Sequence, residues 1–165
     1  MNPSLQEPRF KKIGVALVIA WGHVIVGQRQ PGQSFAGLAE FPGGKVESGE
    51  DFAAAACREC LEETGLAVAA ERLLDAWQSI RVADDGIEEI FRIEFWQCRP
   101  VSLSNNLLES SLLESSLLTS SLAGAFHWVP IADLAQLKFP SANTKIIELL
   151  LSRNFSQSEE PHHGS

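Results

Sequence analysis

Four charged residues in the short stretch RECLEE are the part of this sequence best suited to chemistry. Arg58 is followed by Glu59, Glu62 and Glu63, whose carboxylates would share an arc of roughly 100° on one face of a helix. Like charges three and four residues apart repel each other, so the cluster is costly unless a cation sits among the carboxylates. Clustered oxygen ligands suit Mg²⁺, with Mn²⁺ as a substitute. The alternative interpretation is an acidic helix face exposed to solvent.

Composition and charge exclude several classes of protein. The chain has 165 residues, of which 45% are apolar, as in one globular domain. Its 13 Lys and Arg and 21 Asp and Glu give a formal net charge of −8, which argues against binding a nucleic-acid polymer. The longest apolar run, 14–21, is too short to span a membrane. Because no secretory signal is recognised, we expect a cytoplasmic location. We also expect a monomer.

The elements around the cluster follow from residue patterns. In the first third of the chain these patterns predict a strand over 12–20, a strand over 23–28 and a loop rich in Gly and Pro over 29–44. The helix that carries the cluster is expected over 52–64. Asp51 or Ser48 can cap its first turn, and Gly65 can supply the left-handed residue that ends it. Cys57 and Cys60 form a C-x-x-C pair, which we interpret as small core residues and not as a redox or zinc pair.

The remainder of the chain predicts further strands and a closing helix. The expected elements are strands over 72–82, 87–98 and 126–129 and a helix over 144–153. An Asp-Gly turn at Asp85-Gly86 favours a hairpin between the first two of these strands. Apolar and charged residues alternate over 90–96, which predicts one packed face and one face in water. An antiparallel or mixed sheet is therefore expected.

A longer motif surrounds the cluster. The order G-x5-E-x7-R-E-x-x-E-E-x-G-hydrophobic runs from Gly44 to Leu66 and includes Glu50. It resembles the signature of the Nudix hydrolase family. Cys60 stands where the family usually has an aliphatic residue. A free cysteine packs as a small apolar side chain, so the position should tolerate it. The resemblance implies an α/β fold, a Nudix-type α/β/α sandwich with a mixed β-sheet.

The resemblance also implies roles for individual residues. The catalytic residues would be Glu50, Arg58, Glu59, Glu62 and Glu63; the metal would be bound by Glu59, Glu62, Glu63 and the carbonyl of Gly43. Within this set, Glu50 and Arg58 would orient the ligating carboxylates. The loop over 39–45 with the preceding Arg29, and the late segment over 139–143, resemble the MutT branch of the family. They supply the substrate-binding residues Arg29, Glu40, Phe41, Lys45 and Asn143. For Asn143, the open alternative is a cap on the closing helix.

The activity that the resemblance implies is Mg²⁺-dependent hydrolysis of a small nucleotide, as in MutT-like enzymes that sanitise the nucleotide pool and so serve DNA replication and repair. An oxidised deoxynucleoside triphosphate such as 8-oxo-dGTP would yield the monophosphate and pyrophosphate. The alternatives are a Nudix hydrolase for CTP, ADP-ribose or a dinucleotide, and a module that senses nucleotides without cleaving them.

A repeat interrupts the domain. Residues 107–121 read LLESS-LLESS-LLTSS, a five-residue period that fits neither a helix nor a strand. We expect a surface insertion at about 102–123 within a single domain over 10–154, preceded by an extension over 1–9 and followed by a flexible tail over 155–165. Glu109 and Glu114 are the candidate general bases inside the insertion, and the base is left unassigned.

Overall fold

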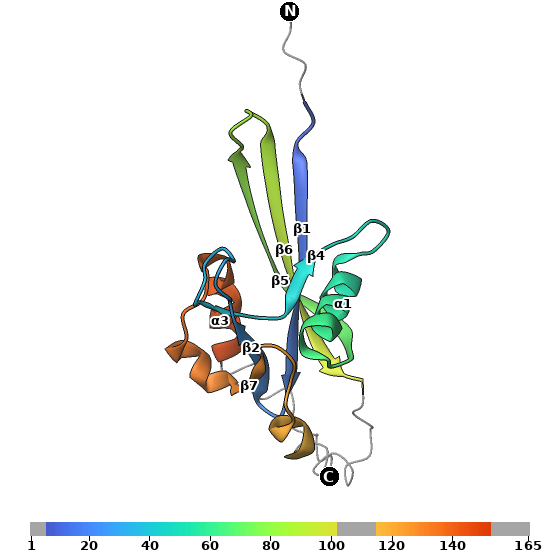
Figure 1. Cartoon of the computed structure of the whole chain (residues 1–165), viewed down its shortest axis with the longest axis vertical. Helices are drawn as coiled ribbons and strands as arrows, with labels where there is room; N and C mark the ends of the chain where they lie inside the picture. Colours follow the sequence, from blue (N-terminus) through green and yellow to red (C-terminus); the bar gives the residue numbers. More distant parts are fainter. Residues whose placement is uncertain (1–5, 102–114, 153–165) are drawn as a thin grey trace, which may run out of the picture.

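The computed structural model describes residues 6–101 and 115–152 of the chain. A mixed β-sheet lies between helix α1 on one side and helix α3 with two short 3-10 helices on the other (Figure 1). This arrangement confirms the expected α/β/α sandwich. In the described part of the chain, no helix is long and apolar enough to cross a membrane.

The elements follow the predicted order with modest changes at their ends. They are β1 (Arg9–Ala20), β2 (His23–Gln28), β3 (Ala39–Glu40), β4 (Gly43–Lys45), α1 (Phe52–Thr64), β5 (Val68–Val82), β6 (Glu88–Pro100), β7 (His127–Pro130), η1 (Ile131–Gln136), η2 (Ser141–Asn143) and α3 (Thr144–Leu151). The prediction of a loop over 29–44 is wrong at its end, where two short strands form. Glu40 pairs with Gly27 of β2, and Gly43 and Gly44 pair with β1.

The order of strands in the sheet is β3-β2-β1-β6-β5, with β4 also paired to β1 and β7 to β2. Strand β1 is central: it runs parallel to β6 and antiparallel to β2 and β4. Strand β5 pairs antiparallel with β6 through the hairpin turn that the Asp-Gly dipeptide predicts. The sheet is therefore mixed, as expected.

Helix α1 begins and ends at the residues that the sequence indicates. The Asp51 carboxylate accepts a hydrogen bond from the Ala54 N–H at 2.8 Å, so Asp51 and not Ser48 is the cap. Gly65 ends the helix with φ 77°, and its N–H donates to the Leu61 carbonyl. A Cβ on Gly14 of β1 would overlap the carbonyl oxygen of Phe52. A glycine is needed there because the start of α1 lies directly on the sheet.

Both faces of the sheet are covered, each by its own apolar cluster. One cluster packs towards α3 and η1 and includes Leu17, Phe95 and Ile146; the other packs towards α1 and includes Ala56, Cys60 and Cys98. Cys60 and Cys98 are buried, Cys57 is partly buried, and all three cysteines are free thiols, which confirms their interpretation as core residues.

The prediction that one face of the strand would be in water over 90–96 is wrong. Glu94 is buried, accepts hydrogen bonds from the Arg92 guanidinium and from Trp96 Nε1, and lies on the face that α1 covers. The residues do alternate between the two faces, but helix α1 covers the face of Glu94, and strand periodicity does not show which face a helix covers.

Much of the expected insertion lies outside the described residues. Glu109 and Glu114 are among those left undescribed, so neither candidate base is placed. Residues 115–119 are helical, and Thr119 Oγ1 donates to the Ser115 carbonyl. The domain boundaries and the tail remain predictions.

Candidate active site

The carboxylate face of α1 lies against β4. A Cβ on Gly44 would overlap the carboxylate of Glu59, so a larger residue would push that carboxylate out of its present position. The N–H of Gly43 donates to Glu63 Oε2 at 3.3 Å. The two glycines therefore bring the backbone of β4 next to two of the three predicted metal ligands.

Arg58 connects the parts of the predicted motif. Its guanidinium donates to Glu50 Oε1 (2.7 Å) and Oε2 (3.2 Å), to the Lys45 carbonyl (2.9 Å), to Glu59 Oε1 (3.0 Å) and to Glu62 Oε2 (3.3 Å). A planar guanidinium with fixed donors suits such a role better than a lysine would. These contacts tie the loop before α1 to the face of the helix.

Two carboxyl groups of this site differ in their protonation. The hydrogen bonds from Arg58 and the backbone N–H of Glu47 hold the pKa of Glu50 below its usual value. Burial raises the pKa of Glu63 to about 7, against the opposing hydrogen bond from Gly43, and the nearby Glu59, Glu40 and Glu62 raise it further. Glu50 has its counter-charge, whereas Glu63 still requires a proton or a cation.

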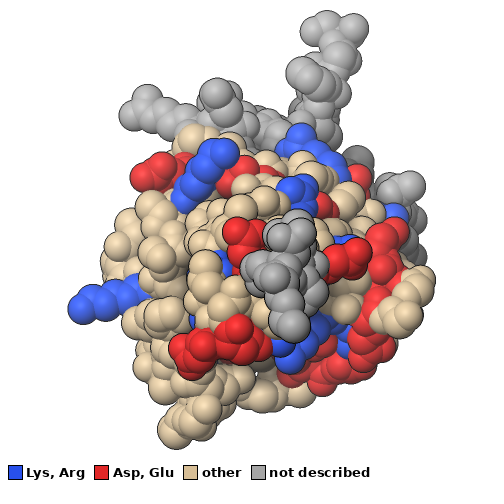
Figure 2. Space-filling view, turned by 90° about the horizontal axis from the view of Figure 1, so that it is seen from above, with Lys and Arg blue, Asp and Glu red and all other residues tan. Residues whose placement is uncertain are grey.

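The donor set fits a hard divalent cation, but it is not assembled into a cage. Among residues 6–101 and 115–152, no three acidic, His or Cys side chains already converge as metal ligands. Glu59 and Glu62 turn towards Arg58 instead. The ligands are nevertheless oxygens, and the carboxyl of Glu63 is short of positive charge. Seen from above, acidic side chains gather on the side of the molecule that carries α1 (Figure 2).

Arg29 and Glu40 form a second polar group beside the helix. Arg29 Nη1 donates to Glu40 Oε2 at 3.1 Å, and Arg29 Nε donates to the Ser34 carbonyl at 2.5 Å. Burial raises the pKa of Glu40, and the Arg29 charge opposes that change. Because Glu40 also acts on the pKa of Glu63, the structure places the predicted substrate loop next to the predicted metal ligands.

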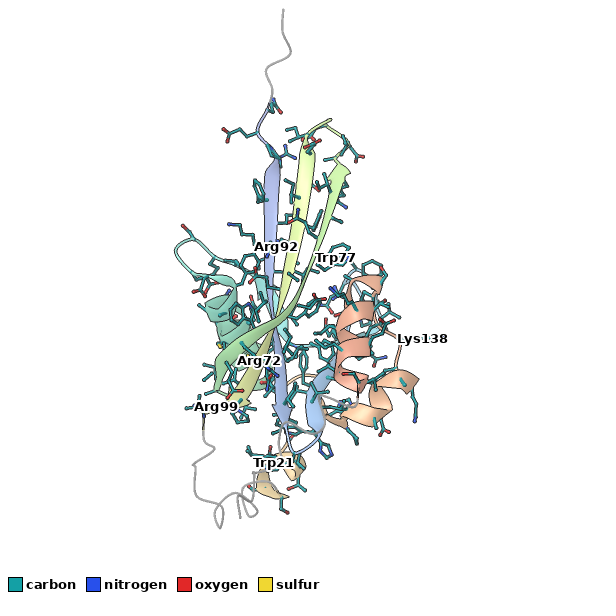
Figure 3. The ribbon with its side chains drawn as sticks, turned by 180° about the vertical axis from the view of Figure 1, so that it is seen from behind. Trp21, Arg72, Trp77, Arg92, Arg99 and Lys138 are labelled. Carbon is teal, nitrogen blue, oxygen red and sulfur yellow. The ribbon has the colours of Figure 1, made fainter. Side chains whose placement is uncertain are left out.

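Phe41, which the resemblance predicts to bind substrate, lies largely inside the fold. Phe41 is only 6% exposed and stacks on Phe139, with ring centroids 4.9 Å apart. Phe139 is the partly exposed member of the pair. It was missed as a single residue, although its place in the segment that resembles the MutT branch was a usable signal. Trp77 of β5 packs against the same cluster, on the α3 side of the sheet (Figure 3).

Asn143 and Lys45 lie in different surroundings. Asn143 directly precedes α3, but its side chain makes no capping hydrogen bond; its Nδ2 donates to the Pro140 carbonyl at 3.2 Å. The alternative that Asn143 caps the helix through its side chain is therefore wrong. Lys45 is exposed at the end of β4, and its backbone carbonyl accepts from Arg58.

The sheet, the capped helix and its row of carboxylates define a class of hydrolase, and the comparison with known families agrees. The chain belongs to the Nudix hydrolase family: the family model described as the NUDIX domain matches residues 10–150. This match confirms the family inferred from the motif.

Its relatives are MutT-like. Over 58 residues the chain is 41% identical to the 8-oxo-dGTP diphosphatase of Haemophilus influenzae, a match that covers 35% of this chain and 43% of that protein. The chain thus spans less than half the length of the curated relative it matches. The Escherichia coli ORF135 protein superposes with a TM-score of 0.63 at 20% identity, over 93% of this chain and 96% of that one. The MutT protein of Methanosarcina mazei superposes with a TM-score of 0.57 at 19% identity, over 89% and 96%.

Proposed function

We propose that the protein is a Mg²⁺-dependent nucleoside triphosphate pyrophosphohydrolase that converts an oxidised deoxynucleoside triphosphate, such as 8-oxo-dGTP, to the monophosphate and pyrophosphate. The observation that carries the proposal is the α1 face, where Glu59 and Glu63 lie against Gly44 and Gly43 and Arg58 joins them to Glu50. The partial match to an 8-oxo-dGTP diphosphatase supports the choice of substrate.

Glu59, Glu62, Glu63 and the carbonyl of Gly43 are the residues that would hold Mg²⁺, with Mn²⁺ as a substitute. A bound divalent cation lowers the pKa of water and neutralises negative charge on a diphosphate. The protein's own part is to hold the carboxylates in place. Arg58 does this through its hydrogen bonds to Glu59 and Glu62, while the Glu50 carboxylate fixes the guanidinium.

The substrate would lie between the Arg29–Glu40 pair and the start of α3. The Arg29 guanidinium can bind phosphate oxygens with the donors that do not contact Glu40. The exposed Lys45 ammonium at the end of β4 can bind them as well. Asn143 presents an amide, which can both donate to and accept from a base edge. In place of Phe41, the partly exposed ring of Phe139 is the candidate for packing against the base.

The test is formation of nucleoside monophosphate, followed by chromatography, in the presence of Mg²⁺ from a panel of 8-oxo-dGTP, ordinary nucleoside triphosphates, ADP-ribose and NADH, because all of these substrates yield a monophosphate when their diphosphate bond is cleaved. Glu62→Gln is the informative variant because the Glu62 side chain is 58% exposed, so that the loss of its charge disturbs the fold least. Glu148→Gln, on the exposed side of α3, is the matched control.

The proposal expects preferential cleavage of 8-oxo-dGTP by the wild type and the control, with a loss of about 100-fold or more in Glu62→Gln. Preference for ADP-ribose or NADH would overturn the substrate. If nucleotides bind but no compound is cleaved, the protein is a sensor and the proposed activity is wrong.

A further inference from the structure

The outer parts of three strands form an arm that extends beyond the helices (Figure 1). We define the arm as residues 9–12 of β1, 78–82 of β5 and 88–92 of β6. Phe10 pairs with Ile90, and Ile90 pairs with Ile80, so these three side chains form one row across the arm. No helix within residues 6–101 and 115–152 covers this row of large apolar side chains.

The face on which this row lies is settled by the register. Gly14, Glu94 and Ala76 form a parallel row four residues nearer the body of the domain, and Gly14 lies directly beneath Phe52 of α1. Because residues two and four apart in a strand share a face, the Phe10 row lies on the α1 face of the sheet, beyond the start of the helix.

The row is exposed. Phe10 is 61% exposed and Ile80 is 59% exposed. Val82, on the same face and two residues nearer the tip, is 66% exposed. Ile90 lies between them and is partly buried. Contiguous apolar side chains of this kind mark interaction surfaces on proteins that otherwise bury such residues.

The opposite face of the arm differs in chemistry. Its charges are already paired: Arg9 with Asp85 at 2.6 Å, and both Lys11 (3.0 Å) and Arg81 (2.6 Å) with Glu89. Lys11 and Arg81 also lie over the ring of Phe91. The charged side chains of that face bind one another. Among the described residues, the α1 face is the one whose exposed side chains are left without such contacts.

Charged residues bracket the apolar row with opposite signs. Glu88 lies on the tip side of the row, and Lys12 and Arg92 lie on the body side, all on the same face. In the described part of the chain neither Glu88 nor Lys12 takes part in an ion pair, while Arg92 binds the buried Glu94. Along the strands, the surface therefore changes from a negative charge at the tip, through the apolar row, to positive charges near the body of the domain.

We propose that this face of the arm binds the same face of a second copy of the chain. A two-fold axis along the Phe10 row stacks the two arms with antiparallel strands. Because Ile90 lies midway between positions 88 and 92, this rotation places position 88 of one copy opposite position 92 of the other. Glu88 of each copy then faces Arg92, and its neighbour Lys12, of the second copy. A surface that is complementary to itself in charge and apolar area is what a symmetric interface requires.

The association is weak and reversible, because the apolar row is smaller than the roughly 800 Å² per partner of a standard interface. It replaces the expectation of a monomer. The proposal does not depend on the proposed hydrolase function, since no residue of the arm belongs to the candidate active site.

The test is the mass in solution, by sedimentation equilibrium and light scattering, from about 1 µM to about 1 mM protein. The wild type is expected to rise from 18.0 kDa towards twice that value. Ile80→Lys should remain monomeric. Leu73→Lys, which replaces an exposed apolar residue of the same strand outside the arm, should associate as the wild type does. Glu88→Lys should shift the dissociation constant upwards by about tenfold at low salt and less at high salt.

A cross-link tests the orientation. A short bis-maleimide should join Ile80→Cys to itself, because this position lies on the axis, and should not join Ser79→Cys on the opposite face, each compared with the wild type as background. Circular dichroism and thermal unfolding establish that each variant is folded. A wild type that is monomeric throughout, an Ile80→Lys variant that dimerises normally, or equal cross-linking at positions 79 and 80 would each overturn the proposal.

Discussion

The carboxylate of Glu59 occupies the space that a Cβ at Gly44 would need. The glycine at position 44 thus lets the Glu59 carboxylate lie against β4, and backbone conformation does not call for it, because Gly44 is not among the glycines with positive φ. This relationship links the glycine at the start of the motif to the first glutamate of its helix.

Replacement of Gly44 tests that relationship. Gly44→Ala should abolish most hydrolysis but lower the free energy of unfolding by no more than about 1 kcal/mol, because the methyl group displaces only the end of the flexible Glu59 side chain. In a Glu59→Ala background, where the obstructing carboxylate is absent, the same replacement should cost much less stability. A double-mutant cycle by urea denaturation measures the coupling. Equal costs in both backgrounds would show that Gly44 is needed for another reason.

The raised pKa of Glu63 makes stability depend on pH. Its pKa is about 7 in the fold and near 4.5 when unfolded, so the folded state favours the protonated carboxyl. Below about pH 4.5 both states hold the proton. As pH rises from 4.5 through 7, the unfolded state releases its proton first, and stability should fall by about 1–2 kcal/mol after allowance for solvent screening. Glu63→Gln should remove this fall, measured by denaturation with a chelator present at about pH 5 and pH 8; Glu148→Gln should retain it.

Arg58 should tolerate no substitute that lacks its fork of donors. Arg58→Lys keeps the charge but cannot bind Glu50, Glu59 and the Lys45 carbonyl together, and we expect a loss of about 10-fold to 100-fold in kcat. Glu50→Gln should have a similar effect, and the double variant should be little worse than either single one. Fully additive losses would indicate that the two residues act independently.

Divalent metal should both activate and stabilise the protein. A chelator is expected to abolish hydrolysis, and Mg²⁺ to restore it and raise the Tm, because the ion neutralises carboxylates that repel each other. Glu62→Gln should require about 10-fold to 100-fold more Mg²⁺ for the same rise in Tm. A Tm that is indifferent to Mg²⁺ and Mn²⁺ would contradict the assignment of these ligands.

The two stacked phenylalanines should separate substrate binding from stability. Phe139→Ala should raise KM for the preferred nucleotide several-fold with a moderate loss of stability, since Phe139 is partly exposed. Phe41→Ala should instead lower the free energy of unfolding by about 3–5 kcal/mol, because Phe41 is buried. Steady-state kinetics and denaturation of both variants decide the matter; a KM effect confined to Phe41→Ala would reverse the assignment.

Local signals account for what could be predicted. Asp51 and Gly65 delimit α1 through their own hydrogen bonds and conformation, so the helix and its carboxylate face were read directly from the sequence. Glu94 and Phe41 could not be placed in this way. Whether a strand residue meets water or a helix depends on which face the distant α1 or Phe139 covers, and neither strand periodicity nor residue type contains that information.

The same limit applies within the site. The spacing of Glu59, Glu62 and Glu63 correctly places them on one side of α1, but not their orientation towards Arg58 or the contact of Glu63 with the Gly43 N–H. The orientation of these side chains depends on their contacts with β4 and with the loop before α1, and these contacts exist only in the folded chain.

The parallel pairing of β1 with β6 has a consequence for how the chain folds. Arg9 pairs with Glu89, 80 residues later in the sequence, and this register continues through Val18 and Cys98. Contacts between such distant residues carry a large entropic cost before they form, and chains rich in them fold slowly. A ribosome must therefore complete β6 before the central strand gains its parallel neighbour. Until then, the apolar residues of β1 remain without half of their sheet and are open to capture by a chaperone.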